Sequence, residues 1–196
     1  MDLLFYAGDC QEREPAPAGS CQPGTLEVWS PSLRRIVPRG LPLYPFAIWW
    51  FFHYLRVFKN RQYKLVLIRH EGRVVHRSTI VPCYFRFPFM RPDDVQIGVW
   101  TEPEYRGLGL TGFALEKAIE LTRGASRRIW YIVKEANQSS VRVAEKQGLL
   151  FAGRGARVSR FGLRILGKFV LETPSLSSDR GRPKGTRRQD PVHSKP

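Results

Sequence analysis

Cysteine is scarce in this chain, and its few copies form no recognisable pattern. The 196 residues include three cysteines, Cys10, Cys21 and Cys83. An odd number without C-x-x-C spacing argues against a zinc site and against a disulfide framework. We therefore expect free thiols in a reducing cytoplasm, and the sequence predicts no metal site.

Hydrophobic runs of membrane-spanning length are also missing. The most apolar run, residues 46–58 (FAIWWFFHYLRVF), is 13 residues long, whereas a spanning helix needs about 20. The N-terminus lacks the basic segment of a signal peptide. We expect a cytoplasmic protein in which residues 46–58 form a helix that starts at Pro45 and is buried in the core or lines a substrate pocket. The alternative is a helix that lies in a membrane interface, which would make the protein membrane-peripheral.

Negative charge is in short supply. Lys and Arg number 32 against 17 Asp and Glu, which gives a net charge of +15. Residues 173–196 carry six Lys/Arg and two Asp without apolar periodicity, so we expect this basic tail to be disordered. The rest of the chain keeps +11. A basic body indicates an anionic partner, which is a phosphorylated cofactor or substrate, nucleic acid, or an acidic membrane surface.

Hydrophobic periodicity predicts one α/β domain over residues 25–172. Its order is strand, helix, three strands, helix, strand, helix and two strands. This order predicts a mixed α/β (α+β) sheet of six to seven strands, with an antiparallel front half and a βαβα back half. Residues 1–24 are predicted to be an N-terminal extension, in which residues 2–7 are a candidate short strand. Residues 173–196 are assigned to the tail.

Residues 95–112 (VQIGVWTEPEYRGLGLTG) join a strand to a helix through a glycine-rich turn. Apolar residues alternate before the turn, and Pro103 ends the strand. Gly107 and Gly109 stand where the helix begins, so backbone N–H groups can approach an anion closely. The helix N-terminus adds unpaired donors and the positive end of its dipole. The pattern predicts a diphosphate-binding turn, and the alternative is a tight turn without a ligand.

A second block of residues lies about 30 positions downstream. It reads N-x-x-S-x-R-x-x-E-K-x-G-L, from Asn137 to Leu149. Together with Y-R-G-x-G at Tyr105 to Gly109, it resembles the GNAT superfamily of acyl-CoA N-acyltransferases. The resemblance covers roughly residues 60–153. The chain also resembles, more weakly, GNAT-type proteins found in bacterial surface-polysaccharide biosynthesis.

The resemblance implies transfer of an acyl group, acetyl in the simplest case, from acyl-CoA to an amine that attacks the thioester directly. It also implies a sheet with a central V-shaped splay that holds the acyl donor. Amides of the turn would bind the pyrophosphate, the strand end would pair with the pantetheine arm, and Asn137 would contact that arm from the other wall. Lys146 or Arg142 would meet a phosphate. The implied donor-binding residues are Trp100, Thr101, Arg106, Gly107, Leu108, Gly109, Leu110, Thr111, Asn137 and Lys146.

Proton transfer is assigned less directly. The family often places a carboxylate about a dozen residues before the Arg-Gly pair, which makes Asp94 the first candidate for the base, unless it only turns the chain. Glu102 is the second candidate. The tyrosine that often serves as the acid is replaced by Ala144. Tyr84 is then a candidate acid, as are Tyr105 and Tyr131, or no acid is needed because positioning supplies much of the rate.

The acceptor side is predicted from aromatic residues. Residues 46–58 and 83–91 are expected to line it, which favours a small-molecule amine such as an amino sugar or a nucleotide sugar. The alternative function is a GNAT-like module of weak activity that binds nucleic acid or another anionic surface through its basic body and tail. The Arg-Gly-x-Gly turn opposes this alternative, because a pure binding module has no need of a diphosphate turn.

Overall fold

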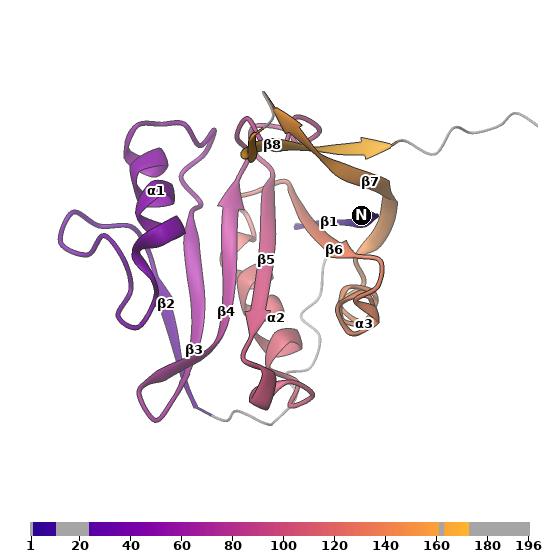
Figure 1. Cartoon of the computed structure of the whole chain (residues 1–196). Helices are drawn as coiled ribbons and strands as arrows, with labels where there is room; N and C mark the ends of the chain where they lie inside the picture. The colour runs from indigo at the N-terminus through magenta and orange to yellow at the C-terminus, as the bar shows by residue number, and fades with distance from the viewer. Residues whose placement is uncertain (1, 11–23, 161–162, 173–196) are drawn as a thin grey trace, which may run out of the picture.

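The computed structural model describes residues 2–10, 24–160 and 163–172 (Figure 1). The predicted tail and Cys21 lie outside these residues. The described residues form eight strands, three α-helices and a short 3-10 helix, Pro103–Tyr105. The strands are β1 (Leu3–Asp9), β2 (Thr25–Trp29), β3 (Lys64–His70), β4 (Arg73–Pro82), β5 (Val95–Thr101), β6 (Arg128–Lys134), β7 (Leu150–Arg160) and β8 (Leu163–Glu172). The helices are α1 (Leu43–Tyr54), α2 (Leu110–Thr122) and α3 (Gln138–Lys146).

All eight strands belong to one sheet, in the order β2-β3-β4-β5-β6-β1-β7-β8. Neighbouring strands are antiparallel except β5 and β6, which are parallel. The parallel pair is connected through α2, as a crossover connection requires. The mixed α/β fold is therefore confirmed, with one strand more than the six to seven predicted.

The additional strand is β1, and it lies inside the sheet. Residues 1–24 were predicted to be an extension, but Leu3–Asp9 pairs with β6 on one edge and with β7 on the other. Phe5 is fully buried. Leu4 and Tyr6 belong to one hydrophobic core, whereas Leu3 and Phe5 belong to the other. A strand that is paired on both edges and buried on both faces is part of the domain, so the extension assignment is corrected for these residues.

The sheet separates two hydrophobic cores. α2 and α3 pack on one face, where the core includes Ile97 of β5 and Leu115 of α2. α1 and residues 83–91 pack on the other face, in a core rich in aromatic rings such as Tyr63 and Phe87. Because side chains alternate along a strand, Gln96 and Gly98 face α1 while Ile97 faces α2.

The sheet splays between β5 and β6. The two strands pair over three positions only, residues 95–97 with 129–131. Beyond this point β5 stays paired with β4 as far as Thr101, and β6 stays paired with β1 as far as Lys134 (Figure 1). The opening lies at the carboxyl ends of two parallel strands, which is where ligands bind in open α/β sheets. The predicted V-shaped splay is present.

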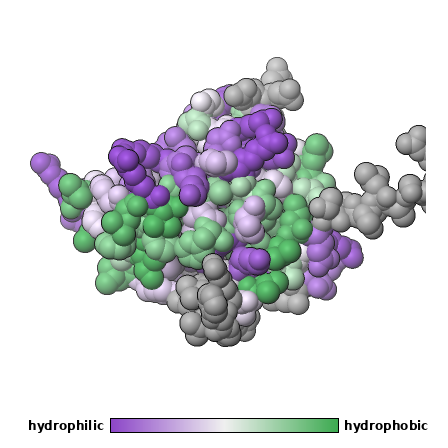
Figure 2. All heavy atoms as spheres, turned by 90° about the horizontal axis from the view of Figure 1, so that it is seen from above, coloured by the Kyte–Doolittle hydropathy of each residue, from purple (hydrophilic) through white to green (hydrophobic). Residues whose placement is uncertain are grey.

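α1 is not the buried core helix that its composition allowed. Within the helix Phe46 is buried, while Leu43 and Phe51 are exposed by 68% and 53%. A helix that is apolar on every side can turn only one side toward the sheet. Figure 2 shows apolar residues gathered on the side of the molecule where α1 lies. In the described part of the chain, no helix has the length and hydrophobicity needed to span a membrane.

Candidate active site

The glycine-rich turn has the conformation that an anion site requires. Gly107 and Gly109 have φ values of 83° and 77°, in the left-handed region that other residues rarely adopt. α2 begins at Leu110, and its first internal bond runs from the Phe113 N–H to the Gly109 carbonyl. The amides of residues 110–112 therefore have no acceptor among the described residues. Three unpaired donors at a helix N-terminus favour an anion.

Two adjoining pockets surround this turn. The turn pocket, of about 270 Å³, lies over the glycines, and the slot, of about 470 Å³, lies between the ends of β5 and β6. Both are polar in part, because serine and threonine hydroxyls line them. The residues common to both pockets are Thr101, Arg106, Thr111, Ser139 and Ser140.

Most of the predicted donor-binding residues meet in these two pockets. The residues that line them are Trp100, Thr101, Arg106, Gly107, Gly109, Leu110, Thr111 and Asn137. Leu108 is exposed and is not among the lining residues. Lys146 lies in the last turn of α3 and is not among the lining residues, although Val143, one turn earlier, lines the turn pocket. The role of Lys146 stays a prediction.

Asn137 has two roles that its position explains. It caps α3, with its side-chain oxygen accepting from the Ser140 N–H at 3.3 Å and from the Ser139 hydroxyl at 2.8 Å. It also lines the slot. Since the cap uses the oxygen, the NH₂ group is the part of the side chain that can donate to a ligand.

A buried polar network holds the β5 end of the slot. The Thr101 hydroxyl lies 2.7 Å from His76 Nδ1 and 3.0 Å from the Thr111 hydroxyl, and His76 Nε2 lies 3.0 Å from the Ser78 hydroxyl. His76 is fully buried, and burial, followed by the charge of Arg77, lowers its pKa to about 4. A neutral imidazole thus links β4, the end of β5 and the start of α2. A single histidine in a strand gave no sequence signal for this role.

Asp94 lies far from the slot. It directly precedes the seven-residue β5, so about 23 Å of extended strand separate it from Thr101. The carboxylate is 2% exposed and accepts from the Trp130 indole at 2.9 Å and from the Arg91 amide at 3.0 Å. These contacts fix the turn before β5. The geometry therefore disfavours Asp94 as the base. The sequence prediction rested on a count of residues before Arg106, and such a count does not show which end of the strand reaches the slot.

The other candidates for proton transfer lie at different places around the sheet. Glu102 is half-buried and follows Thr101, but it does not line the pockets described here. Tyr105 lines the turn pocket. Burial raises the pKa of Tyr131 to about 12, with the Ser140 side chain opposing the shift. Burial also raises the pKa of Tyr84, which lies in a pocket on the other face of the sheet. All four stay predictions.

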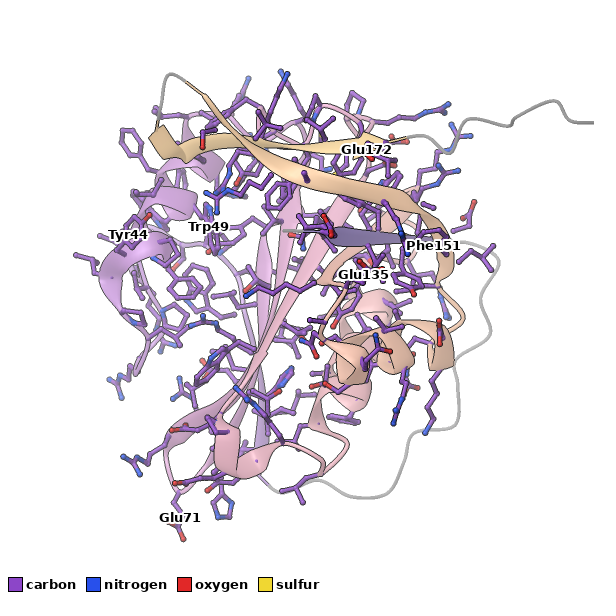
Figure 3. The ribbon with its side chains drawn as sticks, turned by 45° about the vertical axis from the view of Figure 1, so that its right-hand side comes forward. Tyr44, Trp49, Glu71, Glu135, Phe151 and Glu172 are labelled. Atoms are coloured by element: carbon purple, nitrogen blue, oxygen red, sulfur yellow. The ribbon has the colours of Figure 1, made fainter. Side chains whose placement is uncertain are left out.

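A third pocket, the aromatic pocket of about 250 Å³, lies between α1 and the sheet. It shares Val99 and Trp100 with the slot, so the two spaces meet at the edge of β5. Trp49 of α1 lies toward the sheet and lines this pocket, while Tyr44 lies on the outer side of the helix (Figure 3). The α1 part and the 83–91 part of the predicted acceptor side therefore come together here. The lining residues of residues 83–91 are Tyr84, Arg86 and Phe87.

A fourth pocket, the outer pocket of about 480 Å³, continues from the aromatic pocket toward β7 and β8. The two share Gln96, Phe87 and Phe169. Neither the aromatic nor the outer pocket was marked by a sequence motif, because their lining residues come from strands and segments far apart in the chain. The sequence motifs therefore predicted residues that meet in the turn pocket and the slot, but only the general region of the aromatic pocket.

Comparison with known proteins decides the family. A model of the acetyltransferase (GNAT) family matches residues 26–149. The chain belongs to this family. No curated protein sequence matches. The resemblance to proteins of surface-polysaccharide biosynthesis is not confirmed.

Solved structures agree with the GNAT fold. A GCN5-related N-acetyltransferase-like protein from Streptococcus suis matches with a TM-score of 0.51 and 18% identity, over 78% of this chain and 58% of the other. A GNAT acetyltransferase from Colwellia psychrerythraea matches with a TM-score of 0.50 and 10% identity, over 78% of this chain and 53% of the other. This chain spans less than two thirds of either structure. At these identities the likeness shows the fold alone.

Asp94→Asn tests the structural role of that carboxylate. Hydrogen bonds to a charged group are worth about 1.5–3 kcal/mol, so we expect the variant to lose about 1–3 kcal/mol of unfolding free energy in denaturant titrations. Its kcat–pH profile should be unchanged, with Asp93→Asn, at an exposed neighbour, as the control. A fall in kcat of about 100-fold in the folded variant would instead identify Asp94 as the base.

The neutral His76 predicts a pH-dependent stability. Its pKa is about 4 when folded and about 6.5 when unfolded, so the unfolded chain binds the proton more readily. Stability is then fully present above about pH 6.5 and falls as the pH approaches 4, by about 1.5–2 kcal/mol between pH 6.5 and 5. Denaturant titrations should show this slope in the parent and in His70→Asn, and a clearly smaller slope in His76→Asn, where the lowered pKa of His53 still contributes in the same direction. A slope of undiminished size in His76→Asn would contradict the assignment.

Proposed function

We propose that this GNAT protein is an N-acetyltransferase that moves an acetyl group from acetyl-CoA to a small-molecule amine by direct attack on the thioester. The observation that carries the proposal is the row of unpaired amides at residues 110–112, held open by Gly107 and Gly109 beside the slot. Acetyl-CoA carries a pyrophosphate, which is the anion that such a turn suits. A cytoplasmic location remains part of the proposal.

The residues around the slot supply binding and orientation. After Ile97, the edge of β5 that faces β6 has no strand partner among the described residues, so its N–H and C=O groups are available to a pantetheine arm. The same edge can polarise the thioester carbonyl by hydrogen bonding. Asn137 reaches the arm from the α3 side, and Thr101 is held in place by His76. Much of the rate then comes from positioning.

The acceptor amine enters from the aromatic pocket, which meets the slot at Val99 and Trp100. The donor and the acceptor thus approach the end of β5 from opposite faces of the sheet and meet at Val99 and Trp100. Among the described residues no Asp or Glu lines the slot or the aromatic pocket. The attacking amine therefore gives up its proton to water or to a group at the rim, such as Glu102.

Gly109→Glu tests the donor site. A carboxylate placed in the turn would repel the pyrophosphate, and like-charge contacts cost several kcal/mol, so we expect acetyl-CoA affinity to fall about 100-fold or more in calorimetric titrations. Gly124→Glu is the matched control, because Gly124 also has a positive φ and open space around it, at the other end of α2. The proposal fails if the parent does not bind acetyl-CoA at hundreds of micromolar, or if both variants bind it equally.

As a second property, we propose that the surface around α1 binds peripherally to anionic membranes. Besides Leu43 and Phe51, exposed apolar residues on this side include Leu33 and Leu55, at 76% and 58% exposure. The sequence from 28 to 70 contains no Asp or Glu, and six exposed cations lie near these apolar residues along the chain. Exposed apolar side chains flanked by cations suit the interface of anionic lipids. These cations are Arg34, Arg35, Arg39, Arg56, Lys59 and Arg61.

Vesicle sedimentation tests the membrane surface. We expect the protein to bind phosphatidylserine-containing vesicles more strongly than phosphatidylcholine vesicles, and to be released by salt. Phe51→Asp and Leu55→Asp should each weaken binding about 10-fold, whereas Leu150→Asp, at an exposed position on β7, should not. Equal sedimentation of all variants, or none with anionic vesicles, would contradict the proposal.

A further inference from the structure

The two pockets on the α1 face of the sheet carry positive charge only. Arg77 and Arg86 line the aromatic pocket, and Lys134 and Arg157 line the outer pocket. Among the described residues that line them there is no Asp and no Glu. Since cavities focus the field of the charges that line them, this space favours an anion.

Among these cations, Arg77 gives the strongest argument for an anionic ligand. It is half-buried in β4, with its guanidinium carbon 5.2 Å from the centre of the Phe46 ring and 5.0 Å from that of Trp100. The two rings hold the planar group by cation–π contact. In the part of the chain that the structure describes, no carboxylate lies within ion-pair distance of Arg77. A charge that is partly desolvated without an acidic partner is a cost to the folded protein, which an anionic ligand would offset.

Arg86 reaches the same pocket from residues 83–91. Its Nε donates to the Gly167 carbonyl at 3.1 Å, and its guanidinium carbon lies 5.6 Å from the centre of the Phe169 ring. These contacts, together with an interaction with the Tyr84 side chain, fix the Arg86 guanidinium in the pocket. A fixed guanidinium presents paired donors that match a carboxylate or a phosphate.

We propose that the acceptor is an amine that also carries an anionic group, a carboxylate or a phosphate, which Arg77 and Arg86 bind. The inference rests on the proposed function, because it names the acceptor class for that same site. With the anion held in the aromatic pocket, the amine reaches the edge of β5 at Val99 and Trp100, where the slot begins. The outer pocket gives room for a larger substituent. Polyamines and basic peptides are excluded by repulsion.

The positive charges that line these pockets also offer a way for the amine to lose its proton without a carboxylate base. A cationic environment disfavours an ammonium ion and lowers the pKa of the bound amine. The neutral amine then attacks the carbonyl carbon of the thioester, forming the C–N bond as the C–S bond breaks. The nitrogen releases one proton to water and the departing thiolate takes up one, so the step is balanced.

Matched acceptor pairs test the inference, with thiol release from acetyl-CoA as the readout. One pair is L-phenylalanine and L-phenylalanine amide, which differ in the carboxylate. The other is glucosamine 6-phosphate and glucosamine, which differ in the phosphate, and spermidine serves as a polycation. We expect the anionic member of at least one pair to have a kcat/KM about 10-fold or more above that of its partner. The pair that shows the larger ratio identifies the anion.

Variants connect the preference to the arginines. Arg77→Gln and Arg86→Gln should each lower kcat/KM for the anionic acceptor by about 10- to 100-fold, mainly through KM, since each removes a charge-assisted bond. The neutral acceptor should change little. Arg73→Gln is the control, at an exposed position of the same strand as Arg77. Acetyl-CoA affinity, measured by calorimetry, should be the same in all four proteins.

The outcomes separate the two proposals. A parent that binds acetyl-CoA but prefers the neutral amines or spermidine overturns this inference and leaves the proposed function standing. The same holds if no anionic amine is acetylated or bound by the CoA-saturated protein, or if Arg77→Gln lowers the rates of both members of a pair equally. Absence of acetyl-CoA binding in the parent overturns both.

Discussion

The early end of the β5–β6 pairing is the constraint on which the rest of the site depends. Only three residues of each strand pair, although each strand is fully paired on its other edge. Unpaired backbone groups in a sheet are normally covered or paired. Here they border the slot, with the N-termini of α2 and α3 on either side. The slot is thus a direct product of strand pairing, and a ligand that forms strand-like hydrogen bonds fits it.

Each wall of the slot is held from outside. β4 pairs with β5 along the whole strand, and the network from Ser78 through His76 to Thr101 ties that wall to the start of α2. β1 pairs with all of β6, and the Tyr6 hydroxyl donates to Glu145 of α3 at 3.3 Å. The N-terminal strand therefore supports the far wall. Because both walls have complete antiparallel partners, the sheet can open between them without losing either strand.

The features that could be predicted from the sequence are those formed by residues close together in the chain. The glycine turn, the α2 helix and the Asn137 cap have local signals, and the structure shows each of them. The place of β1 had none, because it pairs with strands more than 100 residues away. The geometry disfavours Asp94 as the base for a similar reason, since a count along the chain does not say which end of a strand reaches the slot. The aromatic pocket is lined by residues of β4, α1 and the segment 83–91, which only the fold brings together.

The two faces of the sheet differ in the kind of group that can bind an anion. On the α2 side, the proposed donor is bound mainly by backbone amides, which carry no net charge and are fixed by the turn. On the α1 side, the charge sits on side chains, and two of these, Arg77 and Arg86, form no ion pair among the described residues. A single anionic substrate would account for the first arrangement but not for the second. The arginines of the aromatic pocket therefore support the proposal that the second substrate is anionic as well. In that proposal, positive surroundings lower the pKa of the amine and take the place of a carboxylate base.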